Sequence, residues 1–131
     1  MEGFAIRVEE VRDHPDTAVV RLEGVLDLAG VAEANGKVLP LLERGCVRLA
    51  FDCTSLRYLN SPALGSLIAY AKKAREQGGD CVLFGVSPDV LDVLRGVGLT
   101  RVVRVHPARK AALAALERPG GARGEPGKRD G

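Results

Sequence analysis

The sequence contains no tryptophan, and aromatic residues make up only 4% of its 131 positions. Proteins that bind single-stranded nucleic acid stack the bases on aromatic side chains, and cages for quaternary ammonium ligands use the same rings. The chain offers little for either ligand, so we expect no nucleic-acid partner. Its composition is 46% hydrophobic, which is enough for one compact domain with a core of aliphatic side chains.

Long apolar runs are also missing. No stretch approaches the 18 consecutive apolar residues that a membrane-spanning helix needs, and the N-terminus has neither the basic nor the apolar region of a secretory signal. The sequence therefore predicts a soluble, cytoplasmic protein without membrane insertion.

Cysteine and histidine are too few and too scattered for a metal centre. Cys46, Cys53 and Cys81 lack C-x-x-C spacing and lie in or beside apolar strands, which predicts buried, reduced thiols. His14 and His106 have no cysteine or carboxylate at metal-ligand spacing, and no Ser-His-Asp arrangement or phosphate-binding glycine loop is indicated. We expect no metal, no cofactor and no enzymatic activity.

The net charge of +2 comes entirely from the last residues. Residues 118–131 carry four basic and two acidic side chains, so residues 1–117 balance at fifteen of each sign. This C-terminal segment has five glycines, two prolines and a single apolar residue, which is typical of disorder. The sequence predicts one domain over 1–117 and a disordered Gly/Pro/Arg-rich tail over 118–131.

Hydrophobic periodicity predicts an α/β domain. Alternating apolar residues at Phe4, Ile6 and Val8, a turn around residues 13–16 and a second apolar run ending at Gly24 indicate an antiparallel hairpin. The elements expected next are a helix over 28–42 that is kinked or broken at Pro40, a strand over 46–51, a helix over 62–77, a strand over 80–85, a helix over 88–94, a strand over 101–105 and a helix over 107–116. About five strands and about four helices in this order imply a mixed, mostly parallel sheet with right-handed crossovers.

Two helices show a clear apolar face. In the first, the expected core positions are Leu28, Val31, Ala34, Val38, Leu41 and Leu42. In the second they are Leu64, Leu67, Ile68, Ala71 and Ala74, and Arg75 can lay its aliphatic stem beside them. Both faces are expected to cover the sheet.

The start of the second helix carries the most informative serine. Pro62 suits the first helical position, which makes Ser61 the expected N-cap. A hydroxyl at the positive end of a helix dipole can also receive a phosphate or contact a partner. Ser87 and Pro88 repeat the same pattern at another helix start, where only capping is indicated. Capping and phosphate acceptance both remain open for Ser61.

Several short motifs occur in a recognisable order along the chain. They are Gly24 to Asp27, the strand end at Phe51 and Asp52, the loop from Tyr58 to Gly65, the turn from Gln77 to Asp80, and the stretch from Ser87 to Leu99. With the order of elements, they resemble the STAS domain of anti-sigma factor antagonists. The resemblance covers about residues 4–117.

The resemblance implies a STAS-like single domain that acts as a non-enzymatic protein-binding module in signal transduction and transcription regulation. Such a module binds a kinase-fold anti-sigma factor in a partner-switching system, and phosphorylation of one serine, here Ser61, releases it. The implied partner-binding residues are Asp27, Asn60, Ser61, Pro62, Ala63 and Leu64. The alternative is a non-phosphorylated STAS scaffold subunit of a larger signalling or transport assembly.

The phosphorylation loop departs from the family pattern. Relatives usually have an acidic residue, the serine, a second Ser or Thr, then Gly and Leu, whereas this chain has Asn60, Ser61, Pro62, Ala63 and Leu64. Asn60 can support the turn or contact a partner, but it carries no charge. Asp27 can cap the first helix or contact a partner.

Overall fold

The computed structural model describes residues 3–117. These residues form five strands, four α-helices and one short 3-10 turn, η1. In chain order they are β1 (Phe4–Val11), β2 (His14–Leu26), α1 (Leu28–Glu43), β3 (Arg48–Leu59), α2 (Ser61–Glu76), β4 (Asp80–Phe84), α3 (Pro88–Gly96), η1 (Leu99–Arg101), β5 (Arg104–His106) and α4 (Arg109–Glu117).

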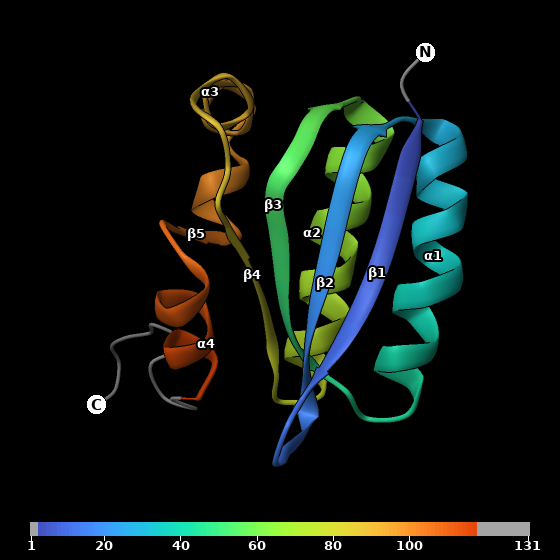
Figure 1. Ribbon diagram of the computed structural model, residues 1–131, viewed down its shortest axis with the longest axis vertical. Helices are drawn as coiled ribbons and strands as arrows, with labels where there is room; N and C mark the ends of the chain where they lie inside the picture. Colours follow the sequence, from blue (N-terminus) through green and yellow to red (C-terminus); the bar gives the residue numbers. More distant parts are fainter. Residues whose placement is uncertain (1–2, 118–131) are drawn as a thin grey trace.

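The five strands form one sheet in the order β1-β2-β3-β4-β5 (Figure 1). β1 pairs with β2 antiparallel, and every later pair is parallel. The predicted α/β domain with a mixed, mostly parallel sheet is therefore confirmed.

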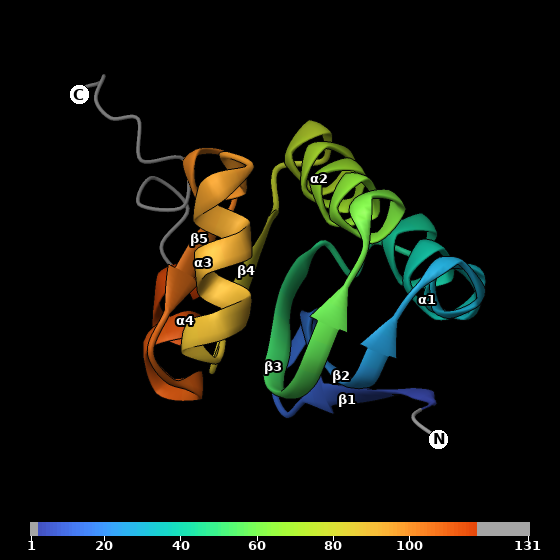
Figure 2. The same ribbon diagram turned by 90° about the horizontal axis from the view of Figure 1, so that it is seen from above.

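Helices cover the two faces of the sheet unequally. The larger core lies beneath α1 and α2, which run side by side over the same face (Figure 2). A smaller cluster on the other face contains Val19, Ala50, Val82 and Phe84 and is closed by α4 through Ala112 and Leu116. β2, β3 and β4 are thus covered on both faces over part of their length.

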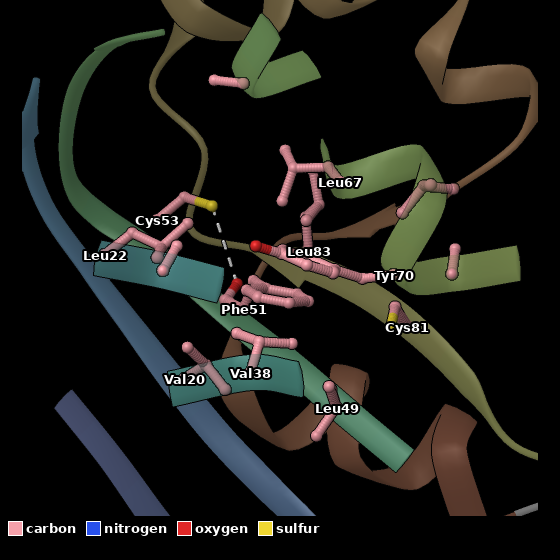
Figure 3. Close-up of a cluster of buried hydrophobic side chains, with 14 of the residues drawn as sticks. Val20, Leu22, Val38, Leu49, Phe51, Cys53, Leu67, Tyr70, Cys81 and Leu83 are labelled. Carbon is pink, nitrogen blue, oxygen red and sulfur yellow. Dashed lines mark hydrogen bonds between the residues drawn. The ribbon is translucent and has the colours of Figure 1, made fainter. Parts of the chain in front are cut away.

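The larger core brings together β3 and α2 (Figure 3). The rings of Phe51 and Tyr70 stack with centroids 6.0 Å apart and an interplanar angle of 13°. Nearby, the Cys53 thiol donates to the carbonyl of Phe51 over 3.7 Å. Cys46, Cys53 and Cys81 are all buried and free, which confirms the sequence prediction.

The β1–β2 hairpin is longer than predicted. Its turn lies at Arg12 and Asp13, and β2 continues through Gly24 to Leu26. Gly24 has φ +88°, and a Cβ there would lie 1.9 Å from the carbonyl oxygen of Gly3. Glycine is therefore required for a close approach inside the strand, where the pairing register with β3 shifts, and it does not end the strand.

Helix α1 passes through Pro40 and ends at Glu43, so the predicted break is wrong, and the alternative of a kink at Pro40 stays a prediction. Pro40 cannot donate to the carbonyl of Gly36, but both residues are exposed, and water can satisfy that carbonyl. Leu41 and Leu42 are buried and hold the last turn against the core.

Two strand boundaries also differ from expectation. β3 runs on to Leu59 because it stays paired with β2 to its end, which leaves Asn60 as the only residue before α2. β5 is limited to three residues, since Arg101 belongs to the 3-10 turn that follows Gly98. The predicted tail over 118–131 lies outside the described residues, so that part of the domain assignment stays a prediction.

Candidate functional site

Two helices begin side by side at one edge of the sheet. β2 and β3 are parallel and end at the paired residues Leu26 and Leu59. Each is followed by a single residue, Asp27 or Asn60, before a helix starts, and the Asn60 N–H donates to the carbonyl of Leu26 over 3.2 Å. This strand-end edge therefore holds the N-termini of α1 and α2 close together (Figure 1).

Asp27 and Asn60 cap these two helices in the same way. Asp27 Oδ1 accepts from the N–H of Gly30 over 3.1 Å, which confirms the predicted cap. Asn60 Oδ1 accepts from the N–H of Ala63 over 3.0 Å. The prediction that Ser61 is the N-cap is wrong, because Asn60 holds the extended cap conformation and Ser61 is already the first helical residue.

The shift by one residue changes what Ser61 can do. Its side chain is exposed, and its hydroxyl has no hydrogen-bond partner within residues 3–117. Ser87, by contrast, is the cap of α3 and accepts from the N–H of Val90 over 3.3 Å, as predicted. The two Ser-Pro pairs look alike in sequence, yet only the Ser87 side chain caps its helix.

The remaining loop residues differ in burial. Pro62 is exposed at the second helical position, and Asn60 is half-buried at the cap. Ala63 is fully buried and Leu64 is 8% exposed, so both side chains belong to the core beneath α2. Their role at the strand-end edge is to fix the helix start that presents Ser61.

The positive end of α2 lacks a compensating side chain. No acidic residue lies in its first turn, whereas the start of α1 has the Asp27 carboxylate on its cap. Two N–H groups in the first turn are already engaged, because Ala63 donates to the Asn60 side chain and Leu64 donates to the Asn60 carbonyl over 3.1 Å. Pro62 has no N–H to offer. The backbone of α2 is therefore a weak phosphate holder at this point.

Sequence reasoning missed two exposed apolar side chains beside the strand-end edge. Tyr58 on β3 is 55% exposed, and Leu28, the first residue of α1, is 69% exposed. The prediction that Leu28 faces the core is wrong because the helix begins beyond the end of the sheet. Their positions in the sequence could have indicated this exposure, since Leu28 lies one residue from the cap Asp27 and Tyr58 lies two residues from the cap Asn60.

A shallow pocket joins the strand-end edge to α3. It has a volume of about 100 Å³ and lies between the end of β3, at Tyr58 and Leu59, and α3, at Val90 and Val93. Val93 is 44% exposed. Apolar surface therefore continues from the capped helix starts onto α3, which is the composition that protein-binding surfaces favour.

The three cysteine thiols that the structure describes have little nucleophilic character. Burial raises the pKa of the Cys53 thiol to about 12 and raises the pKa values of Cys46 and Cys81 as well. These thiols stay protonated near neutral pH and are poor nucleophiles. Within residues 3–117 no three His, Cys, Asp or Glu side chains gather in a way that could hold a metal ion. No helix among the described residues is long and apolar enough to cross a membrane.

Two known bacterial proteins are similar to this chain in sequence. BtrV of Bordetella bronchiseptica is 28% identical over 96 residues, which are 73% of this chain and 83% of BtrV. An anti-sigma F factor antagonist from Paenibacillus polymyxa is 25% identical over 109 residues, covering 82% of this chain and 93% of that protein.

Solved structures share the fold. An anti-sigma factor antagonist from Mycobacterium paratuberculosis superposes with a TM-score of 0.76 at 19% identity, covering 88% of this chain and 95% of that one. The unphosphorylated form of the anti-sigma factor antagonist SpoIIAA gives a TM-score of 0.70 at 21% identity, covering 87% and 98% of the two chains. The family model for the STAS domain matches residues 9–112, and the chain therefore belongs to the STAS domain family.

Proposed function

We propose that this protein is a non-enzymatic anti-sigma factor antagonist that works in the cytoplasm and binds its partner through the strand-end edge. The proposal is supported by the STAS domain and by a relative and two structural neighbours that are described as anti-sigma factor antagonists. It is also supported by the surface itself, which combines two capped helix starts with the exposed apolar side chains of Leu28 and Tyr58.

We further propose that the partner is a kinase-fold anti-sigma factor and that it phosphorylates Ser61. The observation that carries this proposal is the exposed Ser61 hydroxyl, which has no partner among the described residues because Asn60 caps the helix. A serine engaged as a cap would have to leave its helix before it could be modified, and Ser61 does not have this restraint. Asp27 lies on the same edge and is the second proposed contact.

Phosphorylation is expected to act at the interface and not through refolding. A charge near an exposed helix terminus changes stability by about 0.3–1 kcal/mol, whereas reversing a two-state population from 1:99 to 99:1 needs about 5.5 kcal/mol. The α2 start also has few N–H groups left to hold a phosphate. The added charge of about −1.5 to −2 would therefore project toward the partner and disrupt close packing there.

The test begins with affinity purification from the native cell, followed by intact-mass analysis of the recovered protein for one phosphate. Binding of the recovered partner is then titrated against the wild type, Ser61→Ala and Ser61→Glu. Ser61→Glu should weaken binding at least tenfold, and Ser61→Ala should bind like the wild type and resist release by ATP. Ala69→Asp provides the matched control, because it adds a negative charge at an exposed position farther along α2. Equal affinity of Ser61→Glu and the wild type would eliminate the switch.

The alternative is a non-phosphorylated STAS scaffold subunit. It is favoured by Asn60, Pro62 and Ala63, which replace the acid, the hydroxyl and the glycine of the usual loop. In that case the purified complex would persist in ATP, and the protein recovered from cells would carry no phosphate.

A further inference from the structure

A second pocket lies away from the strand-end edge. It has a volume of about 520 Å³, is open to solvent and is lined by residues of α3, η1 and the edge strand β5. Its lining shares no residue with the proposed partner site at Asp27 and Asn60 to Leu64. This volume is within the range of about 300–1,000 Å³ that is typical of sites for small organic molecules. The pocket is therefore large enough for a ligand of its own.

One part of the pocket lining is apolar. Val86, Leu91, Val105 and Pro107 contribute aliphatic surface from three different segments of the chain. Leu91 lies on α3 and Val105 on β5, so the packing of α3 against the end of the sheet shapes the cavity. This part suits the hydrocarbon body of a ligand.

The polar part of the lining is cationic. Arg95 from the last turn of α3 and Arg104 from β5 both line the pocket, together with the hydroxyl-bearing Thr100, and no Asp or Glu is among the lining residues. Arg95 has no ion pair or hydrogen bond with another residue in the part of the chain that the structure describes. Its guanidinium can therefore pair with an anion without first breaking an internal contact.

Arg104 forms a long ion pair with a buried carboxylate. Its Nη2 lies 3.6 Å from Asp80 Oδ2, while the other oxygen of Asp80 accepts from Arg75 Nε over 2.8 Å. One buried carboxylate thus faces two guanidinium groups.

His106 also lines the pocket and has an unsatisfied polar atom. Its Nε2 atom is buried and has no hydrogen-bond partner within residues 3–117. A buried polar atom without a partner is costly. Three elements, α3, η1 and β5, therefore contribute polar groups to the lining of this pocket.

We propose that this pocket binds a small organic anion, with an apolar body of about the size of two fused rings and one carboxylate, sulfonate or phosphate group. Arg95 pairs with the anionic group, Arg104 and Thr100 lie beside it, and the side chains of Leu91 and Val105 pack against the body.

The test uses two probes of the same shape and different charge, naphthalene-1-sulfonate and naphthalene-1-sulfonamide. Each is titrated into the full-length ¹⁵N-labelled chain while amide chemical shifts are recorded. We expect saturable shifts on α3, η1 and β5 with the sulfonate, and binding of the uncharged sulfonamide that is at least tenfold weaker. Arg95→Gln should weaken sulfonate binding about tenfold and leave sulfonamide binding unchanged.

Arg101→Gln is the matched control, because Arg101 is an exposed arginine of η1 that does not line the pocket. It should bind both probes like the wild type. Equal affinity for the two probes, an unchanged affinity of Arg95→Gln for the sulfonate, or shifts confined to other surfaces would each overturn the proposal. The titration needs no protein partner, so its outcome is separate from that of the experiments on Ser61.

Discussion

At the residue scale, Asn60 caps helix α2 and Ser61 presents an exposed hydroxyl. The sequence pattern assigns both of these roles to Ser61. Asparagine and serine are equally good N-caps, and a proline is tolerated at the first or the second helical position because neither N–H is needed within the helix. The sequence therefore gives no reason to choose between adjacent candidates. Ser87 has no such competitor, since Val86 precedes it, and there the sequence prediction is correct.

This division of tasks predicts unequal costs for two neighbouring substitutions. Asn60→Ala should lower the free energy of unfolding by about 1 kcal/mol, because the N–H of Ala63 loses its partner. Ser61→Ala should change it by less than about 0.5 kcal/mol, as for other exposed positions. Urea denaturation of both variants measures the difference, with Ser87→Ala as a positive control for the loss of a cap. A larger cost for Ser61→Ala than for Asn60→Ala would contradict the assignment.

His106 gives the protein a predicted dependence on pH. Burial, and secondarily the charge of Arg104, lower the pKa of His106 below its usual value of 6.5. The unfolded chain therefore binds this proton more readily than the folded chain, so stability falls as the pH drops through about 6.5. Comparing unfolding at pH 7.5 and pH 5.5 for the wild type and His106→Asn checks this. The variant should lose less stability over that interval, and an identical loss would show that His106 does not contribute.

At the element scale, the sequence predicted the apolar faces better than the boundaries. The stripe on α2 is correct, since Leu67 is buried and Ile68 is packed against the core. What periodicity could not show was long-range pairing. Hydrogen bonding to β2 extends β3 to Leu59, and Asp80 is 1% exposed because Arg75, expected only to cover apolar surface, donates to it. The length of β3 depends on a strand that is distant in the sequence. The burial of Asp80 depends on how the fold places Arg75 beside it.

The packing of α2 predicts a graded response along its buried face. Leu67→Ala should cost about 2–5 kcal/mol, because Leu67 is 2% exposed and its removal would leave a cavity beneath the helix. Ile68→Ala should cost less, since Ile68 is only half-buried. Lys72→Ala, at an exposed position of the same helix, should be close to neutral. Chemical denaturation would contradict this if Leu67→Ala and Lys72→Ala had equal midpoints.

At the scale of the whole molecule, the two proposed binding regions lie on different parts of one sheet. The strand-end edge follows β2 and β3, and the cationic pocket lies beside β5. Sequence motifs indicated the first proposed region because its two parts, Asp27 and Asn60 to Leu64, each lie within one short motif. The second joins residues from α3, η1 and β5, which only the fold brings together, and so it could not be found from spacing.

The domain is predicted to be independent of the C-terminal tail. Residues 119–131 contain almost no apolar side chains, so their deletion should leave the melting temperature unchanged. Differential scanning calorimetry of the full chain and of residues 1–118 tests this. A loss of several degrees, equivalent to about 1 kcal/mol in a domain of this size, would mean that the tail contributes to stability.

The single-residue links at Asp27 and Asn60 have a practical consequence for engineering. Each link must end a strand, accept from a helix N–H and turn the chain within one residue, so there is no room for an insertion at this edge. At the opposite end of the sheet, Gly45 and Gly78 occupy open turns in which a Cβ would meet no atom within 4 Å. Epitope tags or fluorescent reporters inserted there would stand a full strand length from Ser61 and leave the proposed binding edge uncovered.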